Sequence, residues 1–122
     1  MKTTIRIASL LSLLGAAGTG MACDYPAKVD IPSGTTATKE EMVAAYQGVK
    51  EFVANIDVYL ECIVEEEEIA RLAMEDLAPE VEQAREDKLT QKYNAAVEDS
   101  EMTAERFNTE YRTFKAREEG EG

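Results

Sequence analysis

The feature that most constrains the fold of this chain is a pair of apolar stripes, one in each half, whose members follow one another in steps of three, four or seven residues. Such spacing places side chains on one face of an α-helix and is typical of helices that pack against each other. The stripes are Met42, Tyr46, Val49, Val53, Ile56, Leu60 and Ile63, and then Leu89, Tyr93, Val97, Ala104, Phe107, Tyr111 and Phe114. No alternating strand pattern is found, so the sequence predicts an all-α fold.

The two stripes are separated by a turn that we expect near residues 76–79, where Pro79 stands. A proline either kinks a helix or takes the first position of a new one, and a single kinked helix is the alternative because the first stripe continues beyond it. Folding the chain back brings apolar residues to the same levels: Tyr46 and Tyr111, Val49 and Phe107, Val53 and Ala104, and Leu60 and Val97. We therefore expect a long antiparallel two-helix hairpin over residues 38–118, with a capping box of Thr38 and Glu41 at its start. Residues 119–122 are expected to fray.

The first 22 residues have the three parts of a signal peptide. Lys2 and Arg6 supply the positive region, an apolar run of 11 residues follows, and small residues lead to Ala22. A run of this length is too short for a transmembrane helix, which needs about 20 residues. We expect residues 1–22 to be removed and the mature chain, which begins at Cys23, to be periplasmic or secreted.

Removal of this segment leaves a strongly acidic chain. The whole sequence has 13 basic and 25 acidic side chains, and the loss of Lys2 and Arg6 leaves 11 and 25, a formal charge of −14. Such a charge opposes binding to nucleic acid and to anionic lipid surfaces. We expect no nucleic-acid partner and no membrane association unless Cys23 is acylated, which leaves an unknown protein partner or a homodimer.

The chain has two cysteines, Cys23 and Cys62, and an even pair in a small exported domain indicates one disulfide. Residues 23–37 hold two prolines and a Ser-Gly turn, and when extended they are long enough to run back along the first helix as far as Cys62. We expect this extended N-terminal lead to be stapled to the first helix and to cover Phe52 and Tyr59. Two alternatives stay open: a lipidated Cys23 with a lone Cys62, or two free thiols.

Few residues of the chain suit catalysis or metal binding. It has no histidine, which is the commonest general base and a frequent ligand of transition metals. It also has no CxxC pair, nucleophile motif or glycine-rich phosphate loop, so we expect no enzyme activity and no cofactor. The acidic run offers only a weak divalent-cation candidate in Glu65, Glu66 and Glu68. A solvated helix face is the better interpretation, because hard cations usually take ligands that converge from a shaped loop.

Short motifs are spread over most of the mature chain: Cys23…Pro26, Asp30-Ile31-Pro32-x-Gly34, Ala37-Thr38-x-x-Glu41-Met42, Tyr59-Leu60-x-Cys62, Tyr93-Asn94-Ala95-Ala96-Val97 and Arg106-Phe107-Asn108. Together they resemble small uncharacterised exported two-cysteine helical proteins of Gram-negative bacteria. The resemblance implies a signal peptide, a two-cysteine lead and a helical pair, and it brings no known activity. From the sequence we expect a non-enzymatic periplasmic binding or structural module. The alternatives are a lipid-anchored envelope spacer acylated at Cys23 and, third, a weak divalent-cation-binding acidic protein.

Overall fold

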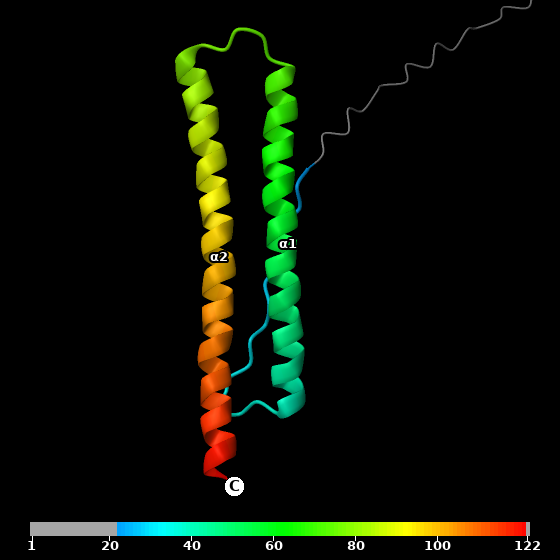
Figure 1. Cartoon of the computed structure of the whole chain (residues 1–122), viewed down its shortest axis with the longest axis vertical. Coiled ribbons are helices and arrows are strands. Elements are labelled where there is room, and N and C mark those ends of the chain that lie inside the picture. Colours follow the sequence, from blue (N-terminus) through cyan, green and yellow to red (C-terminus); the bar gives the residue numbers. More distant parts are fainter. Residues whose placement is uncertain (1–21, 122) are drawn as a thin grey trace, which may run out of the picture.

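The computed structural model describes residues 22–121, which form a long antiparallel hairpin of two helices (Figure 1). Helix α1 spans Lys39–Leu72 and helix α2 spans Pro79–Gly120. This architecture confirms the predicted all-α hairpin and excludes the single kinked helix. Helix α2 continues into the tail, residues 119–122, that the sequence predicted to fray. Neither helix contains a stretch that is long and apolar enough to cross a membrane.

Local sequence explains where both helices begin. The hydroxyl of Thr38 accepts a hydrogen bond from the Glu41 backbone N–H at 3.2 Å, and the Glu41 carboxylate accepts one from the Thr38 N–H at 2.7 Å. Pro79 is the first residue of α2, a position at which the backbone N–H has no helical partner to lose. The connection therefore covers residues 73–78, a slightly earlier turn than predicted. Within it Asp76 has a φ of 48°, a left-handed conformation that aspartate tolerates better than most residues.

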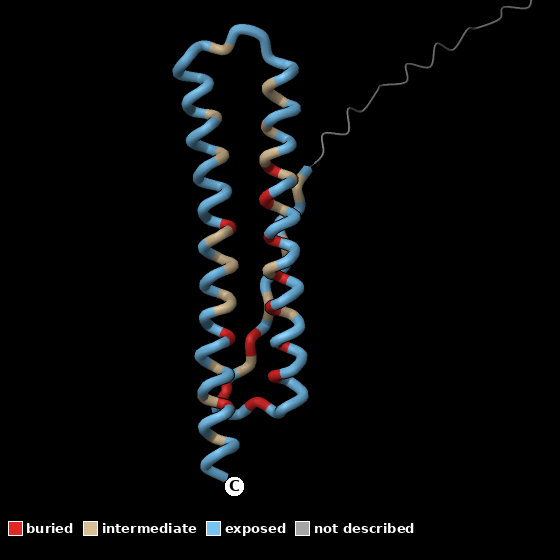
Figure 2. The backbone as a smooth tube through the Cα atoms, in the orientation of Figure 1, coloured by how far each residue is buried: buried red, intermediate tan, exposed pale blue. Residues whose placement is uncertain are grey.

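The core is a thin double cluster between the helices (Figure 2). We call the end where α1 begins the open end and the end with the connection the loop end. The open-end cluster contains Ile31, Ala37, Met42, Ala45, Val49, Phe107 and Phe114, and the second contains Phe52, Ile56, Leu60, Ile63 and Ala96. Val53 and Ala104 pack on the first cluster and Val97 on the second. Three of the four predicted pairs, Val49 with Phe107, Val53 with Ala104 and Leu60 with Val97, thus lie within one cluster each.

The lead, residues 23–37, packs against both helices, on one face of the hairpin. It runs back from the start of α1 as predicted (blue to cyan in Figure 1), but it also forms hydrogen bonds to α2. The Gly34 N–H donates to the Glu110 carboxylate at 2.7 Å, and the Tyr25 hydroxyl donates to Asp99 at 2.7 Å. The lead therefore fills a groove between the helices, whereas the sequence predicted only that it follows the first helix.

Two glycines allow this close approach. A Cβ atom on Gly34 would collide with the backbone oxygen of Glu110 and would lie 2.8 Å from the backbone nitrogen of Phe114. On α1, a Cβ atom at Gly48 would lie 3.1 Å from a methyl carbon of Val29. Backbone atoms of a helix cannot give way as a flexible side chain can, so the position of Gly34 requires a residue without a side chain.

Candidate functional site

Cys23 and Cys62 form a disulfide, with their Cα atoms 5.8 Å apart. The bond joins the start of the lead to α1 and confirms the pairing that the sequence predicted. The sulfur of Cys23 is used in this bond, so it is not free to carry a lipid in this structure. Disulfides form and persist in oxidising compartments, which agrees with the expected export. The predicted signal peptide itself, apart from Ala22, lies outside the described residues.

Aromatic packing surrounds the disulfide where the lead crosses α1. The rings of Tyr25 and Tyr59 meet edge to face, with centroids 5.0 Å apart, and Phe52 is buried beneath the lead. These contacts confirm that the lead covers Phe52 and Tyr59. Desolvation, together with the hydrogen bond to Asp99 and its negative charge, raises the pKa of Tyr25 to about 12. The neutral hydroxyl therefore holds the start of the lead against α2.

The acidic run does not converge on one point. An oxygen of Glu66 lies 3.3 Å from the sulfur of Cys23, on the side of the lead, and this is a contact without a hydrogen bond because a disulfide sulfur carries no hydrogen. Glu65 and Glu68 line the other face of the hairpin. Within residues 22–121, no three acidic, cysteine or histidine side chains are grouped as metal ligands. The weak cation candidate of Glu65, Glu66 and Glu68 is thus not brought together.

Glu67, next in the same run, instead holds the loop end of the hairpin together. Arg85 of α2 donates two hydrogen bonds to its carboxylate, at 2.9 and 2.8 Å, and Arg71 donates a third at 3.0 Å. Only 16% of the Glu67 side chain is exposed. The Arg85 hydrogen bonds, supported by Arg71, hold the pKa of Glu67 below its usual value despite partial desolvation.

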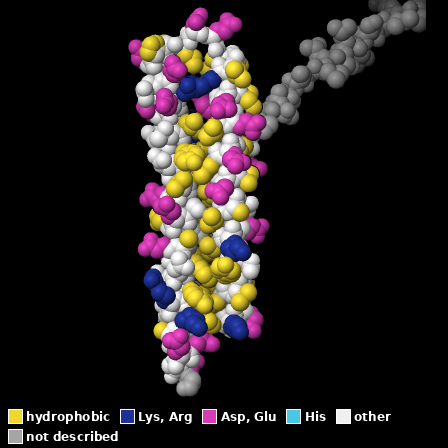
Figure 3. All heavy atoms as spheres, viewed as in Figure 1, with side chains coloured by type: hydrophobic (Ala, Val, Ile, Leu, Met, Phe, Trp, Pro, Cys, Tyr) yellow, Lys and Arg dark blue, Asp and Glu magenta, His cyan; other side chains and the backbone are white. Residues whose placement is uncertain are grey.

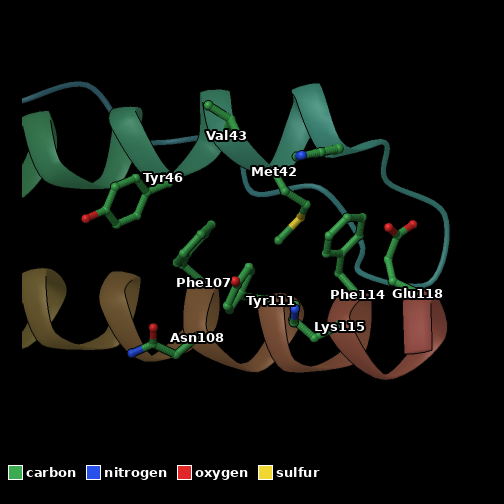
Figure 4. Close-up of a pocket in the computed structure, with 10 residues that line it drawn as sticks. Met42, Val43, Tyr46, Phe107, Asn108, Tyr111, Phe114, Lys115 and Glu118 are labelled. Carbon is green, nitrogen blue, oxygen red and sulfur yellow. The ribbon is translucent and has the colours of Figure 1, made fainter. Parts of the chain in front are cut away.

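The groove on the face opposite the lead is open. At the open end it forms a hollow of about 520 Å³, which we call the aromatic groove (Figure 4). Its apolar lining consists of Met42, Val43, Tyr46, Phe107, Tyr111 and Phe114. Tyr46 and Tyr111 are 47% and 44% exposed, although both belong to the stripes from which the sequence predicted the helix contact. The stripes are wide enough to reach both grooves, and the part of the chain that the structure describes fills only one of them.

The rings of the aromatic groove form a continuous row with a positive border. Tyr46 and Phe107 have centroids 5.9 Å apart, Phe107 and Tyr111 stack at 6.0 Å, and Phe114 follows Tyr111 at 6.4 Å. The ammonium group of Lys50 lies 5.4 Å from the centre of the Tyr46 ring, within the range of a cation–π contact. Such a surface can bind an apolar partner and can attract carboxylates at its border.

Comparison of the chain with protein-family models, with curated proteins and with solved structures found no match. The resemblance to exported two-cysteine proteins accordingly stays a prediction. Function has to be inferred from the disulfide, the lead and the two grooves.

Proposed function

We propose that the protein is a non-enzymatic binding module of the periplasm or of the secreted fraction, and that it acts by holding another protein surface in its open groove. One observation carries this proposal: the hairpin has two grooves, and residues 22–121 fill only one of them. The lead occupies the first and the disulfide ties it there. The second has Tyr46, Tyr93 and Tyr111 half exposed along one face. A row of exposed aromatic residues on a small protein is typical of an interaction surface.

The lining of the aromatic groove supports binding rather than catalysis. Its polar members are Lys39, Asn108, Lys115 and Glu118, together with the two tyrosine hydroxyls. The residues that line it include no serine, cysteine or histidine, so the usual nucleophiles and the commonest general base are not among them. Lysines at the border of an aromatic surface instead suit a protein partner that presents apolar side chains flanked by carboxylates.

Site-specific photo-crosslinking in cells that make the protein tests this proposal. A benzophenone amino acid would replace Tyr46 in the open groove. In a matched control it would replace Glu105, which is exposed on α2 away from both grooves. We expect a discrete protein adduct from position 46 and none from position 105. If position 46 gives no adduct, or if both positions give the same smear, the groove is not a docking surface.

The mass of the purified mature protein tests the proposed compartment and the state of Cys23 together. We expect a chain that begins at Cys23 and that is lighter than its reduced form by the mass of two hydrogens. A gain equal to acyl chains on the first residue would instead identify the lipid-anchored spacer and would contradict the proposal of an unanchored module.

A further inference from the structure

The open face of the hairpin carries opposite charges toward its two ends. At the open end, Lys39 and Lys115 border the aromatic groove together with one acid, Glu118, and Lys50 follows on α1. Nearer the loop end, a second hollow of about 650 Å³ is bordered by four acids and by no described lysine or arginine: Asp57, Glu61, Glu65 and Glu68. Figure 3 shows most of the dark blue side chains of this face beside the lower part of its apolar strip, with one further dark blue group between the helices near the loop end. Around the two hollows, the lysines thus gather at the open end and the acids of α1 nearer the loop end.

The part of α1 on this face is self-complementary when a second copy runs the opposite way. Its residues follow one another at steps of three and four and so lie on one side of the helix. Three pairs of positions at equal distances from a centre between residues 53 and 54 match in kind: Lys50 with Asp57, Lys39 with Glu68, and Val43 with Val64. A fourth pair on this face sets Tyr46 opposite Glu61. An antiparallel pair of α1 helices would thus place each of these lysines near a carboxylate of the other copy, at four places in all.

Helix α2 is compatible with the same centre. Ala104 is the residue of α2 that the hairpin pairing sets opposite Val53, and both pack against the same cluster of the core. About Ala104, the positions at equal distances on this face are Tyr93 with Lys115 and Val97 with Tyr111. A single twofold axis, perpendicular to the helices at this level, would therefore set α1 on α1 and α2 on α2 in the same operation. About this level the named positions of α2 oppose no like charges, so α2 does not conflict with the twofold axis that α1 favours.

We infer that the partner in the open groove is a second copy of this chain, packed face to face and antiparallel as a four-helix bundle. This inference rests on the proposed function, because it names the partner of the same groove. Residues 39–68 of α1 span about 45 Å at the helical rise, and two helices side by side are about 20 Å wide. The face measures about 900 Å² per copy, close to the roughly 800 Å² that each partner buries in a stable complex. A face-to-face pair with its twofold axis parallel to the helices would instead set α1 on α2 of the other copy, with the lysines of both copies at one end and their acids at the other, and is disfavoured.

Charge reversal with rescue tests the inference. One variant carries Lys39→Glu and Lys50→Glu, and the other carries Asp57→Lys and Glu68→Lys. All four side chains are exposed, so each variant is expected to keep the circular dichroism spectrum and the melting temperature of the hairpin. Light scattering should find the unaltered protein dimeric and each variant alone monomeric. An equimolar mixture should be dimeric again, because all four charge contacts in the mixed pair join opposite charges. Glu98→Lys with Glu105→Lys, two exposed acids of α2, is the matched control and should stay dimeric.

The outcomes separate failure of the dimer from failure of the proposed function. Unaltered protein that stays monomeric at millimolar concentration and at several salt concentrations overturns the dimer. In that case an adduct from position 46 to a different protein would still support the proposed binding module. A dimer that survives both charge reversals overturns the antiparallel face-to-face arrangement. If the inference is right, the adduct from position 46 joins two copies and maps to about residues 60–64 of the other chain. An adduct near residue 111 of that chain would show α1 packed on α2 of the other copy, as a twofold axis parallel to the helices requires, and would also overturn the inference.

Discussion

Removal of the Cys23–Cys62 disulfide is expected to lower the free energy of unfolding by about 4 kcal/mol at 25 °C. The bond closes a loop with a sequence separation of 39 residues. For a loop of this size, the chain-entropy relation gives about 13 cal/mol/K, which is about 4 kcal/mol at room temperature. Single domains usually have about 5–15 kcal/mol in total, and this hairpin has a thin core, so the loss is a large share of its stability.

Urea unfolding followed by circular dichroism measures the effect, with the double variant Cys23→Ser and Cys62→Ser against the oxidised protein. The same unaltered chain held in reductant is the control for the substitutions, and it should behave like the double variant. We also expect a steeper dependence on urea once the bond is absent, because the unfolded chain is then less compact. A loss below about 1 kcal/mol in the free energy of unfolding, with an unchanged dependence on urea, would refute the conclusion that loop closure by the disulfide stabilises the fold.

Three further changes probe the lead and the loop end. Gly34→Ala should lower the free energy of unfolding by about 1–3 kcal/mol in urea titrations, because the new methyl group meets the backbone of α2, whereas Gly120→Ala has nothing within 4 Å and should have little effect. Tyr25→Phe should differ from the unaltered protein below pH 10 and converge with it between pH 10 and about 12. The neutral Tyr25 hydroxyl stabilises the fold, as its raised pKa reflects, and this contribution is lost as the pH rises through this range. Melting temperatures of both proteins measured against pH test this, and a difference that stays constant with pH would contradict it. Glu67→Gln should cost about 1 kcal/mol at pH 7. The difference should begin to shrink as the pH falls below about 4.5, because the lowered pKa of Glu67 stabilises the fold only while the carboxylate is ionised. A difference that does not shrink as the pH falls would show that packing is responsible.

The hairpin was predictable from the sequence because its determinants are local or periodic. Thr38 with Glu41 and the proline at residue 79 set the helix starts, and the two stripes set the pairing of levels. The path of the lead was predicted only in part. Its contact with α2 depends on Gly34 fitting against a backbone segment that begins 76 residues later, and no local pattern carries that information.

The candidate site was predictable only in its disulfide. Tyr46 and Tyr111 belong to stripes whose spacing shows that they face a neighbour, but spacing does not show whether that neighbour is in the same chain. Only the position of the lead decides which groove is filled, and therefore which aromatic rings stay exposed. The opposite charges along α1 are present in the sequence as well, but only the structure shows that they lie on the open face.

The disulfide also changes how the molecule would respond to tension. A force applied between Cys23 and the end of α2 would pass through the sulfur bridge directly to Cys62, so residues 24–61 would carry none of it. At about 3.4 Å per residue, the bypassed segment holds about 130 Å of contour length that stretching can release only after reduction. The start of α1, with the aromatic rings that it contributes to the open groove, is thereby shielded from a pull on the chain ends. The force would instead run from Cys62 through the loop end, which Glu67 holds together, to the end of α2.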